Sequence, residues 1–236
     1  MDQGNALAYL VLFSWPIFSI WLYRKKSLQL ATLITIIGGF MLLAVKTSVD
    51  FPLIPPLGKH SMPALSAAIG CWLIKKQKIK IFSNNGLVQV FILLLFIGAF
   101  ITAELNSDRI IIGATVLPGL TLHDATSAVI GVFIQMTPFF IGKQFFKSYQ
   151  DQLLMFRFIV AAGLIYSIPI LYEIRMSPQL HILFYGYFPH GFVQQAREGG
   201  FRAVVFMGHG LWVAFFVTTV LTAALALDKV GEKIRN

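Results

Sequence analysis

Charged residues are scarce in this chain of 236 residues, because Asp, Glu, Lys and Arg together make up 12% of it. A water-soluble domain of this length covers its surface with many more charges, so the shortage excludes an ordinary soluble fold. The single cysteine, Cys71, excludes an intrachain disulfide framework. The sequence has no metal-ligand spacing, phosphate-binding loop, dinucleotide fingerprint or serine nucleophile elbow. We therefore predict neither a metal nor an organic cofactor.

Apolar residues are abundant instead: 57% of the chain is hydrophobic and its mean hydropathy is +0.75. A helix that crosses a bilayer needs about 20 mostly apolar residues. This pattern predicts an all-α fold, a polytopic transmembrane helix bundle that forms one integral-membrane domain over residues 1–236. A segment at 57–74 is weaker than the others because it contains Lys59 and His60. The clearer spans lie near residues 5–23, 28–45, 86–103, 125–142, 153–172 and 203–227.

Clusters of lysine and arginine between the spans predict the orientation. Basic residues at 24–26 follow the first span, and four lysines at 75–80 follow the weak segment. Because such clusters stay in the cytoplasm, an even number of crossings must separate them, so residues 57–74 must cross. We expect about seven spans, with the N-terminus outside, the C-terminus inside and an outer loop at 173–202. The net charge of +9 comes from these clusters, which meet anionic headgroups; membrane lipid is thus the predicted partner, and no nucleic acid.

Polar residues gather in the stretch before the last span, EIRMSPQLHILFYGYFPHGFVQQAREGGFRAVVFMGHG. Arginine suits a diphosphate because its planar fork binds two oxygens at once and keeps its charge. Arg175, Arg197 and Arg202 are therefore candidates for binding a lipid diphosphate. Two alternatives stay open: Arg175 pairs with Glu173, and Arg202 extends from a helix end toward the headgroups.

Two histidines complete the candidate binding site. Arg202 is expected to open the last span, which would place His209 seven residues on, about 10 Å away on nearly the same helical face. Gly208 and Gly210 flank His209 and would let a helix or a ligand come close. A histidine inside a membrane is a functional candidate, although a neutral ring hydrogen-bonded between helices is an equal alternative. His190 lies in the interfacial part of the same stretch.

The connections carry weaker signals. The segment DFPLIPPLGKHSMP at 50–63 contains four prolines and should form a stiff, extended cap. Residues 104–124 are apolar enough to dip into the membrane interface, and Asp124 is expected to cap the helix that follows. Pro16, Pro138 and Pro169 lie within predicted spans, where each frees a backbone carbonyl.

The run YEIRMSPQLH…YGYFPHGFVQQAREGGFRAVVFMGHGLWVAFF resembles the central region of bacterial O-antigen ligase/polymerase-like membrane proteins. The loop FPLIPPLGKHSMPAL resembles an N-terminal piece of one branch of that group. The resemblance implies a glycosyltransferase of the bacterial inner (cytoplasmic) membrane that uses undecaprenyl-diphosphate-linked glycans in O-antigen or exopolysaccharide assembly. Arg197 and Arg202 would match family basic positions near the lipid diphosphate, and His209 matches a motif position without an assigned role. The catalytic residue stays unassigned.

The chain departs from that family in length. Family members have ten or more spans and carry a catalytic histidine in a large periplasmic loop of their second half. We therefore expect this chain to be an N-terminal portion, inactive alone, which works with the missing C-terminal half or with other polysaccharide-assembly proteins. Two other interpretations stay open: a complete seven-helix receptor or sensor, and a small transporter. A transporter predicts paired polar breaks in related halves, which this sequence lacks.

Overall fold

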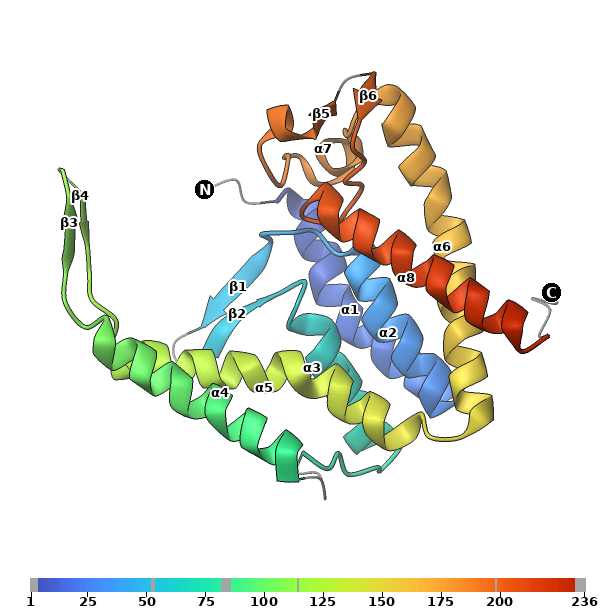
Figure 1. The fold of residues 1–236 in the computed structure, drawn as a ribbon, viewed down its shortest axis with the longest axis horizontal. Coiled ribbons are helices and arrows are strands. Elements are labelled where there is room, and N and C mark those ends of the chain that lie inside the picture. Colours follow the sequence, from blue (N-terminus) through green and yellow to red (C-terminus); the bar gives the residue numbers. More distant parts are fainter. Residues whose placement is uncertain (1–3, 52–53, 82–85, 114, 198, 232–236) are drawn as a thin grey trace.

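The computed structural model describes residues 4–51, 54–81, 86–113, 115–197 and 199–231, and it is mostly helical (Figure 1). The helices are α1 (Ala6–Lys25), α2 (Leu28–Leu42), α3 (Met62–Ile69) with its π-helical continuation η1 (Gly70–Ile74), α4 (Gly86–Leu105), α5 (Leu122–Phe145), α6 (Tyr149–Met176), α7 (Leu180–Tyr185), the 3-10 turn η2 (Phe192–Gln195) and α8 (Gly210–Lys229). Antiparallel hairpins join β1 (Ser48–Phe51) to β2 (Ile54–Gly58), β3 (Ile110–Ile112) to β4 (Thr115–Leu117), and β5 (Ala196–Arg197) to β6 (Gly200–Phe201).

Five helices in the described part of the chain, α1, α4, α5, α6 and α8, are long and apolar enough to cross a membrane. Each has at least 20 residues, the length that a straight crossing needs. The prediction of a membrane-embedded helical protein is confirmed at this level. Helix α2 has 15 residues, and α3 with η1 has eight and five, so the predicted crossings at 28–45 and 57–74 contain shorter helices than expected.

Several helix boundaries differ from the predicted ones. Helix α2 ends at Leu42 because the backbone is already extended at Leu43, and the chain then turns at Lys46, whose φ is +62°. In the segment 57–74 the helix begins only at Met62, because β2 occupies the residues up to Gly58. Helix α6 extends to Met176, so the connection predicted to begin at 173 begins later. The last helix begins at Gly210 rather than 203, because the residues before it form a turn described below.

The helix starts follow the capping rules. Asn5 accepts a hydrogen bond from Ala8 N–H at 3.0 Å, and its amide donates to Phe184 O at 2.9 Å, which ties the start of α1 to α7. Asp124 forms a capping box with Thr121 at the start of α5, as predicted. Ser148 and Asp151 form a second box at the start of α6. Pro16, Pro138 and Pro169 lie inside α1, α5 and α6.

Two apolar clusters hold the centre of the bundle. The first joins α1, α2 and α3, and its buried members are Leu12, Trp15, Leu43 and Met62. The second joins α2, α6, α8 and the chain that precedes α8, and it includes Met41, Ala162, Tyr166, Val205, Met207, Val213 and Phe216. Helices α4 and α5 form a hairpin at the edge of this bundle, and β3–β4 projects from its tip (Figure 1).

The proline-rich segment is extended, as predicted. Ser48 pairs with Gly58 and Val49 with Leu57 in the β1–β2 hairpin, while residues 52 and 53 lie outside the described residues. The hairpin stands beside the centre of the bundle and contacts α5 (Figure 1). It brings the turn between β2 and α3 to the end of the molecule where α2 finishes and α8 begins. We call this the loop end.

Candidate binding site at the loop end

The carbonyl groups that end α2 are capped by side chains from distant parts of the chain. The last carbonyls of a helix have no partner within it and need donors from elsewhere. The donors are Tyr166 Oη to Met41 O (2.9 Å), Tyr185 Oη to Leu42 O (2.6 Å) and Lys59 Nζ to Leu43 O (2.7 Å). A cation is also favoured at a helix C-terminus by the helix dipole. The end of α2 is thereby anchored to α6, α7 and the β2–α3 turn.

Glu173 shapes the chain that leads into α8. Its side chain is fully buried and accepts hydrogen bonds from the backbone N–H groups of Leu180 (2.9 Å), Val204 (2.8 Å) and Val205 (2.7 Å). Val205 has a φ of +52°, a strained conformation for a β-branched residue that costs roughly 1–3 kcal/mol. The carboxylate offsets this strain. The alternative that Glu173 serves to pair with Arg175 was wrong: the acid orders the backbone, and Arg175 is exposed in the last turn of α6.

Lys59 joins the two sides of the loop end. Its side chain is 5% exposed, and Nζ donates to Leu43 O at 2.7 Å and to Phe206 O at 2.8 Å. The ammonium also lies 5.7 Å from the centre of the Phe40 ring, within the range of a cation–π contact. Burial lowers the pKa of Lys59 to about 7. An anion near this buried ammonium would stabilise its charged form.

His181 has a structural role. Its Nδ1 lies 2.8 Å from Tyr187 O, and Nε2 accepts from Val45 N–H at 3.4 Å. Nδ1 therefore carries the proton of the neutral ring and donates it to the carbonyl. Burial, opposed by the Tyr187 bond and assisted by the charge of Lys59, lowers the pKa of His181 to about 4. A neutral histidine bonded on both sides fixes the α7 turn and offers no free ring nitrogen.

A cavity of about 330 Å³ opens at the loop end, and we call it the first cavity. Basic and aromatic residues dominate its lining, and no acidic side chain belongs to it within the described residues. Its walls come from the end of α2, the β2–α3 turn, the loop after α7 and the start of α8. The lining residues are Phe40, Val45, Lys46, Lys59, His60, Pro189, His190, Gly208, His209 and Trp212.

The first cavity brings together two of the predicted site residues, His190 and His209. Their ring centres are 4.9 Å apart in an edge-to-face arrangement. Nδ1 of His190 accepts from Gly191 N–H at 2.7 Å, and Nδ1 of His209 accepts from Leu211 N–H at 3.1 Å. In the neutral rings the proton therefore lies on Nε2, which is a donor. An imidazole N–H group is the kind of donor that binds an anion.

The expected geometry of Arg202 and His209 was wrong. They do not share a helical face, because α8 starts at Gly210 and His209 is its N-cap. The side chain of Arg202, rather than a helix or a ligand, lies against Gly210, where a Cβ would overlap its Cγ and Cδ atoms. The backbone N–H of Arg202 donates to Gln195 O at 2.8 Å. Its half-buried side chain is not among the described residues that line the first cavity.

Of the predicted arginines, Arg175 and Arg202 have described side chains, and neither lines the first cavity. Arg175 is exposed on α6 and does not line the first cavity in the described structure. The backbone of Arg197 pairs with Gly200 in the β5–β6 hairpin, and its side chain lies outside the described part of the chain. The structure thus places the two predicted histidines in the lining of a cavity, and Arg175 and Arg202 lie outside that lining.

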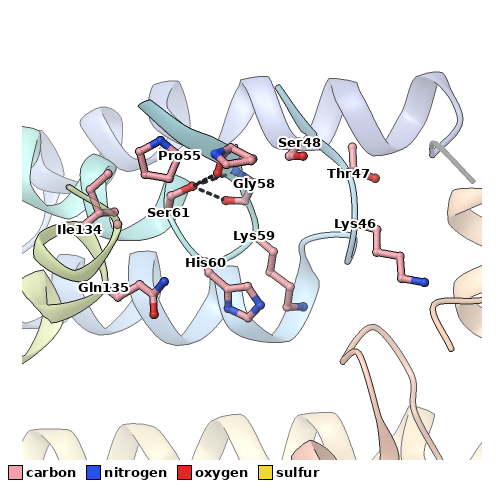
Figure 2. Close-up of a pocket in the computed structure, with 12 residues that line it drawn as sticks. Lys46, Thr47, Ser48, Pro55, Gly58, Lys59, His60, Ser61, Ile134 and Gln135 are labelled. Atoms are coloured by element: carbon pink, nitrogen blue, oxygen red, sulfur yellow. Dashed lines mark hydrogen bonds between the residues drawn. The ribbon is translucent and has the colours of Figure 1, made fainter. Parts of the chain in front are cut away.

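A second cavity of about 280 Å³ adjoins the first and shares Lys46, Lys59 and His60 with it (Figure 2). Burial and the charge of Lys59 lower the pKa of His60. Sequence reasoning placed Lys59 and His60 in the weak segment 57–74, and it proposed none of these three as site residues. The signal was the GKHS run directly after the prolines. The lining is completed by Thr47, Ser48, Pro55, Pro56, Gly58, Ser61, Gly131, Ile134 and Gln135.

The chemistry of this end is that of an anion-binding site. Lysine and imidazole N–H groups line it, and the described residues contain no group of three His, Cys, Asp or Glu that could hold a metal ion. Comparison of the chain with protein-family models, with curated proteins and with solved structures finds no match. The functional argument therefore depends on the site itself and on the sequence resemblance.

Proposed function

We propose that this membrane protein binds the diphosphate head of a polyprenyl-linked saccharide in the first cavity. On this proposal it is the N-terminal portion of an inner-membrane glycan polymerase or ligase that acts on undecaprenyl-diphosphate-linked glycans. The observation that carries it is the histidine pair beside Lys59, at the mouth of an apolar bundle and without an acidic residue in the described lining. The resemblance to O-antigen ligase/polymerase-like proteins supplies the substrate class.

Electrostatics favours an anion over a neutral ligand. Lys46 is exposed, so its ammonium can turn toward the cavity without loss of a buried partner. Lys59 is buried on two carbonyl groups, and an anion close to it would stabilise its charged form. Charge-assisted hydrogen bonds are about twice as strong as neutral ones. A diphosphate offers several acceptor oxygens, enough to contact the lysines and an imidazole ring together.

The cavity also has an apolar side that suits a lipid chain. The rings of Phe40 on α2 and Trp212 on α8 lie 6.4 Å apart and both line it. Trp212 is 52% exposed, on the outer surface of the bundle. Tryptophan is enriched at the membrane–water interface, where one face of the ring is apolar and the N–H is wet. We infer that the polyprenyl chain reaches the cavity between α2 and α8.

The orientation belongs to the same proposal. We infer that α2 and α3–η1 also cross, which gives seven crossings with the loop end outside. Support comes from the basic clusters, because Lys75 Nζ donates to Lys26 O at 2.7 Å and the clusters at 24–26 and 75–80 therefore meet. Gln144, near the end of α5, bonds the backbone of Lys78 and Lys80 at 2.8 Å. The basic connections thus gather away from the loop end, as the positive-inside rule requires.

Binding of a defined lipid to the full chain in nanodiscs tests the proposal. The probe is undecaprenyl diphosphate, with phosphatidylglycerol as an anionic competitor, and native mass spectrometry gives the bound fraction. The double variant Lys46→Ala/His209→Asn removes a cation and an imidazole, while asparagine keeps the N-cap of α8. We expect at least a tenfold loss of affinity, because two charge-assisted bonds of roughly 1.5–3 kcal/mol each are removed.

The matched control is Lys147→Ala/His123→Ala, which removes the same residue types from exposed positions that line neither cavity. It should bind undecaprenyl diphosphate like the wild-type protein. Equal binding by the Lys46/His209 variant would overturn the site. Displacement by an equal concentration of phosphatidylglycerol would show that the cavity takes any anionic headgroup and would overturn the diphosphate assignment.

A further inference from the structure

The two cavities are too small to act separately as sites for a large ligand. Small-molecule sites have volumes of about 300–1,000 Å³. The second cavity (about 280 Å³) falls just below that range and the first (about 330 Å³) at its lower limit, whereas the two together lie well within it. They share Lys46, Lys59 and His60, so a ligand held at these residues can extend into both. The arrangement fits a ligand with two chemically different parts.

The linings of the two cavities differ in the way that such a ligand requires. The first has aromatic and imidazole rings, whereas the second has hydroxyl groups, one amide and two prolines. Gly131, Ile134 and Gln135 stand at i, i+3 and i+4 on α5, so one face of that helix forms a wall of the second cavity. A Cβ on Gly131 would lie 3.5 Å from Pro55 Cγ, which shows how closely this wall meets the hairpin.

Some polar groups of the second cavity are engaged by the protein and others are free for a ligand. Ser61 Oγ accepts from Gly58 N–H at 2.9 Å and donates to Pro56 O at 3.1 Å, so it holds the turn (Figure 2). Within the described residues, Ser48 Oγ and the amide of Gln135 have no hydrogen-bond partner. Figure 2 shows Gln135 extending from α5 toward His60. An amide both donates and accepts, which matches adjacent hydroxyl groups.

We propose that the second cavity binds the sugar ring next to the diphosphate of a polyprenyl-linked saccharide. This inference depends on the proposed function, because a diphosphate bound in the first cavity would reach the second through the shared residues Lys46, Lys59 and His60. Gln135 and Ser48 bond the sugar hydroxyls, and the faces of Pro55 and Pro56 pack against its C–H groups. The site then selects a glycan-bearing carrier over the bare lipid diphosphate.

The test compares lipids with and without a sugar. Full-length protein in nanodiscs is titrated with undecaprenyl diphosphate and with undecaprenyl-diphosphate-linked glucose, galactose and N-acetylglucosamine. Gln135→Ala should weaken binding of the best sugar-bearing lipid roughly three- to tenfold, the effect of one or two hydrogen bonds, and leave the sugar-free lipid unchanged. Gln152→Ala, an exposed glutamine in the first turn of α6, is the matched control and should change neither.

The outcomes separate this inference from the proposed function. If sugar-free and sugar-bearing lipids bind equally and Gln135→Ala changes neither, the sugar site is overturned while the diphosphate site stands. An equal loss for both lipids in Gln135→Ala also overturns it, because the amide then acts on the diphosphate or on the fold. If wild-type protein binds no undecaprenyl diphosphate, the proposed function fails, and the sugar site fails with it.

Discussion

The loop end and the α4–α5 hairpin are held by different forces. At the loop end, the buried side chains of Glu173, Lys59 and Tyr166 bond backbone groups of distant segments. Along α4 the buried residues are Ile92 and Ala103, and most of its large apolar side chains are exposed. A functional cavity needs fixed walls, which hydrogen bonds supply, whereas a helix with a bare apolar surface needs lipid around it.

The largest expected effect is loss of the carboxylate of Glu173. Glu173→Ala leaves two buried backbone N–H groups, of Val204 and Val205, and the partly buried one of Leu180 without an acceptor. Each buried group costs about 1–3 kcal/mol, so we expect at least about 2 kcal/mol of destabilisation. Because Cys71 is buried and is the single cysteine, its reaction with a thiol-reactive dye during heating in detergent reports unfolding. Glu104→Ala, an exposed carboxylate at the end of α4, should leave the transition unchanged. If Glu173→Ala and Glu104→Ala unfold at the same temperature, the carboxylate of Glu173 does not stabilise the loop end.

A charge on α4 tests whether lipid covers it. Leu94 is 55% exposed in the middle of the helix, and Leu94→Asp should cost about 3 kcal/mol of membrane insertion if it faces hydrocarbon. The fraction of chain that stays in carbonate-washed membranes measures this. Leu105→Asp, at the end of the helix, places the charge near the interface and should integrate almost normally. Normal integration of the Leu94 variant would mean that protein or water, not lipid, covers α4.

Glycine substitutions compare the two regions directly. A Cβ at Gly163 of α6 would overlap the side chain of Val220 on α8, so Gly163→Ala should destabilise by about 1–3 kcal/mol. At Gly98 of α4 a Cβ meets nothing within 4 Å, and Gly98→Ala should be neutral or stabilise by up to about 1 kcal/mol through helix propensity. Dye labelling of Cys71 during heating measures both. Equal losses in the two variants would show that α4 packs as tightly as α6.

The smallest effect is the pH dependence from Lys59. Its pKa is about 7 in the folded protein and near 10.5 when exposed, so the unfolded chain binds more protons between these values. Stability should therefore rise with pH above 7, by at most about 1.4 kcal/mol per pH unit. Denaturant unfolding of wild type and Lys59→Met, followed by tryptophan fluorescence at pH 7 and 9, isolates this contribution. A difference that does not change with pH would show that the carbonyl bonds keep the ammonium charged despite its burial.

Composition and local patterns were sufficient to predict the membrane bundle, its longest helices and the cap at Asp124. These features depend on residues within a few positions of one another, so the local amino-acid pattern is enough to predict them. The boundaries near 203 failed because the turn at Val205 depends on Glu173, thirty-two residues earlier. The geometry expected for Arg202 and His209 failed with it, since a helix was assumed where a buried carboxylate holds a turn.

By itself the sequence determined that this protein is embedded in a membrane, because its apolar content far exceeds that of a water-soluble fold. It also determined the positions of the basic clusters. The cavities were decided by tertiary structure. Lys59 and Phe206 are 147 positions apart, and no local pattern reveals that one caps the carbonyl of the other. Lys59 also donates to Leu43 O at the end of α2, where the last carbonyl groups have no donor within their own helix. This one ammonium therefore joins the end of α2 to the chain before α8.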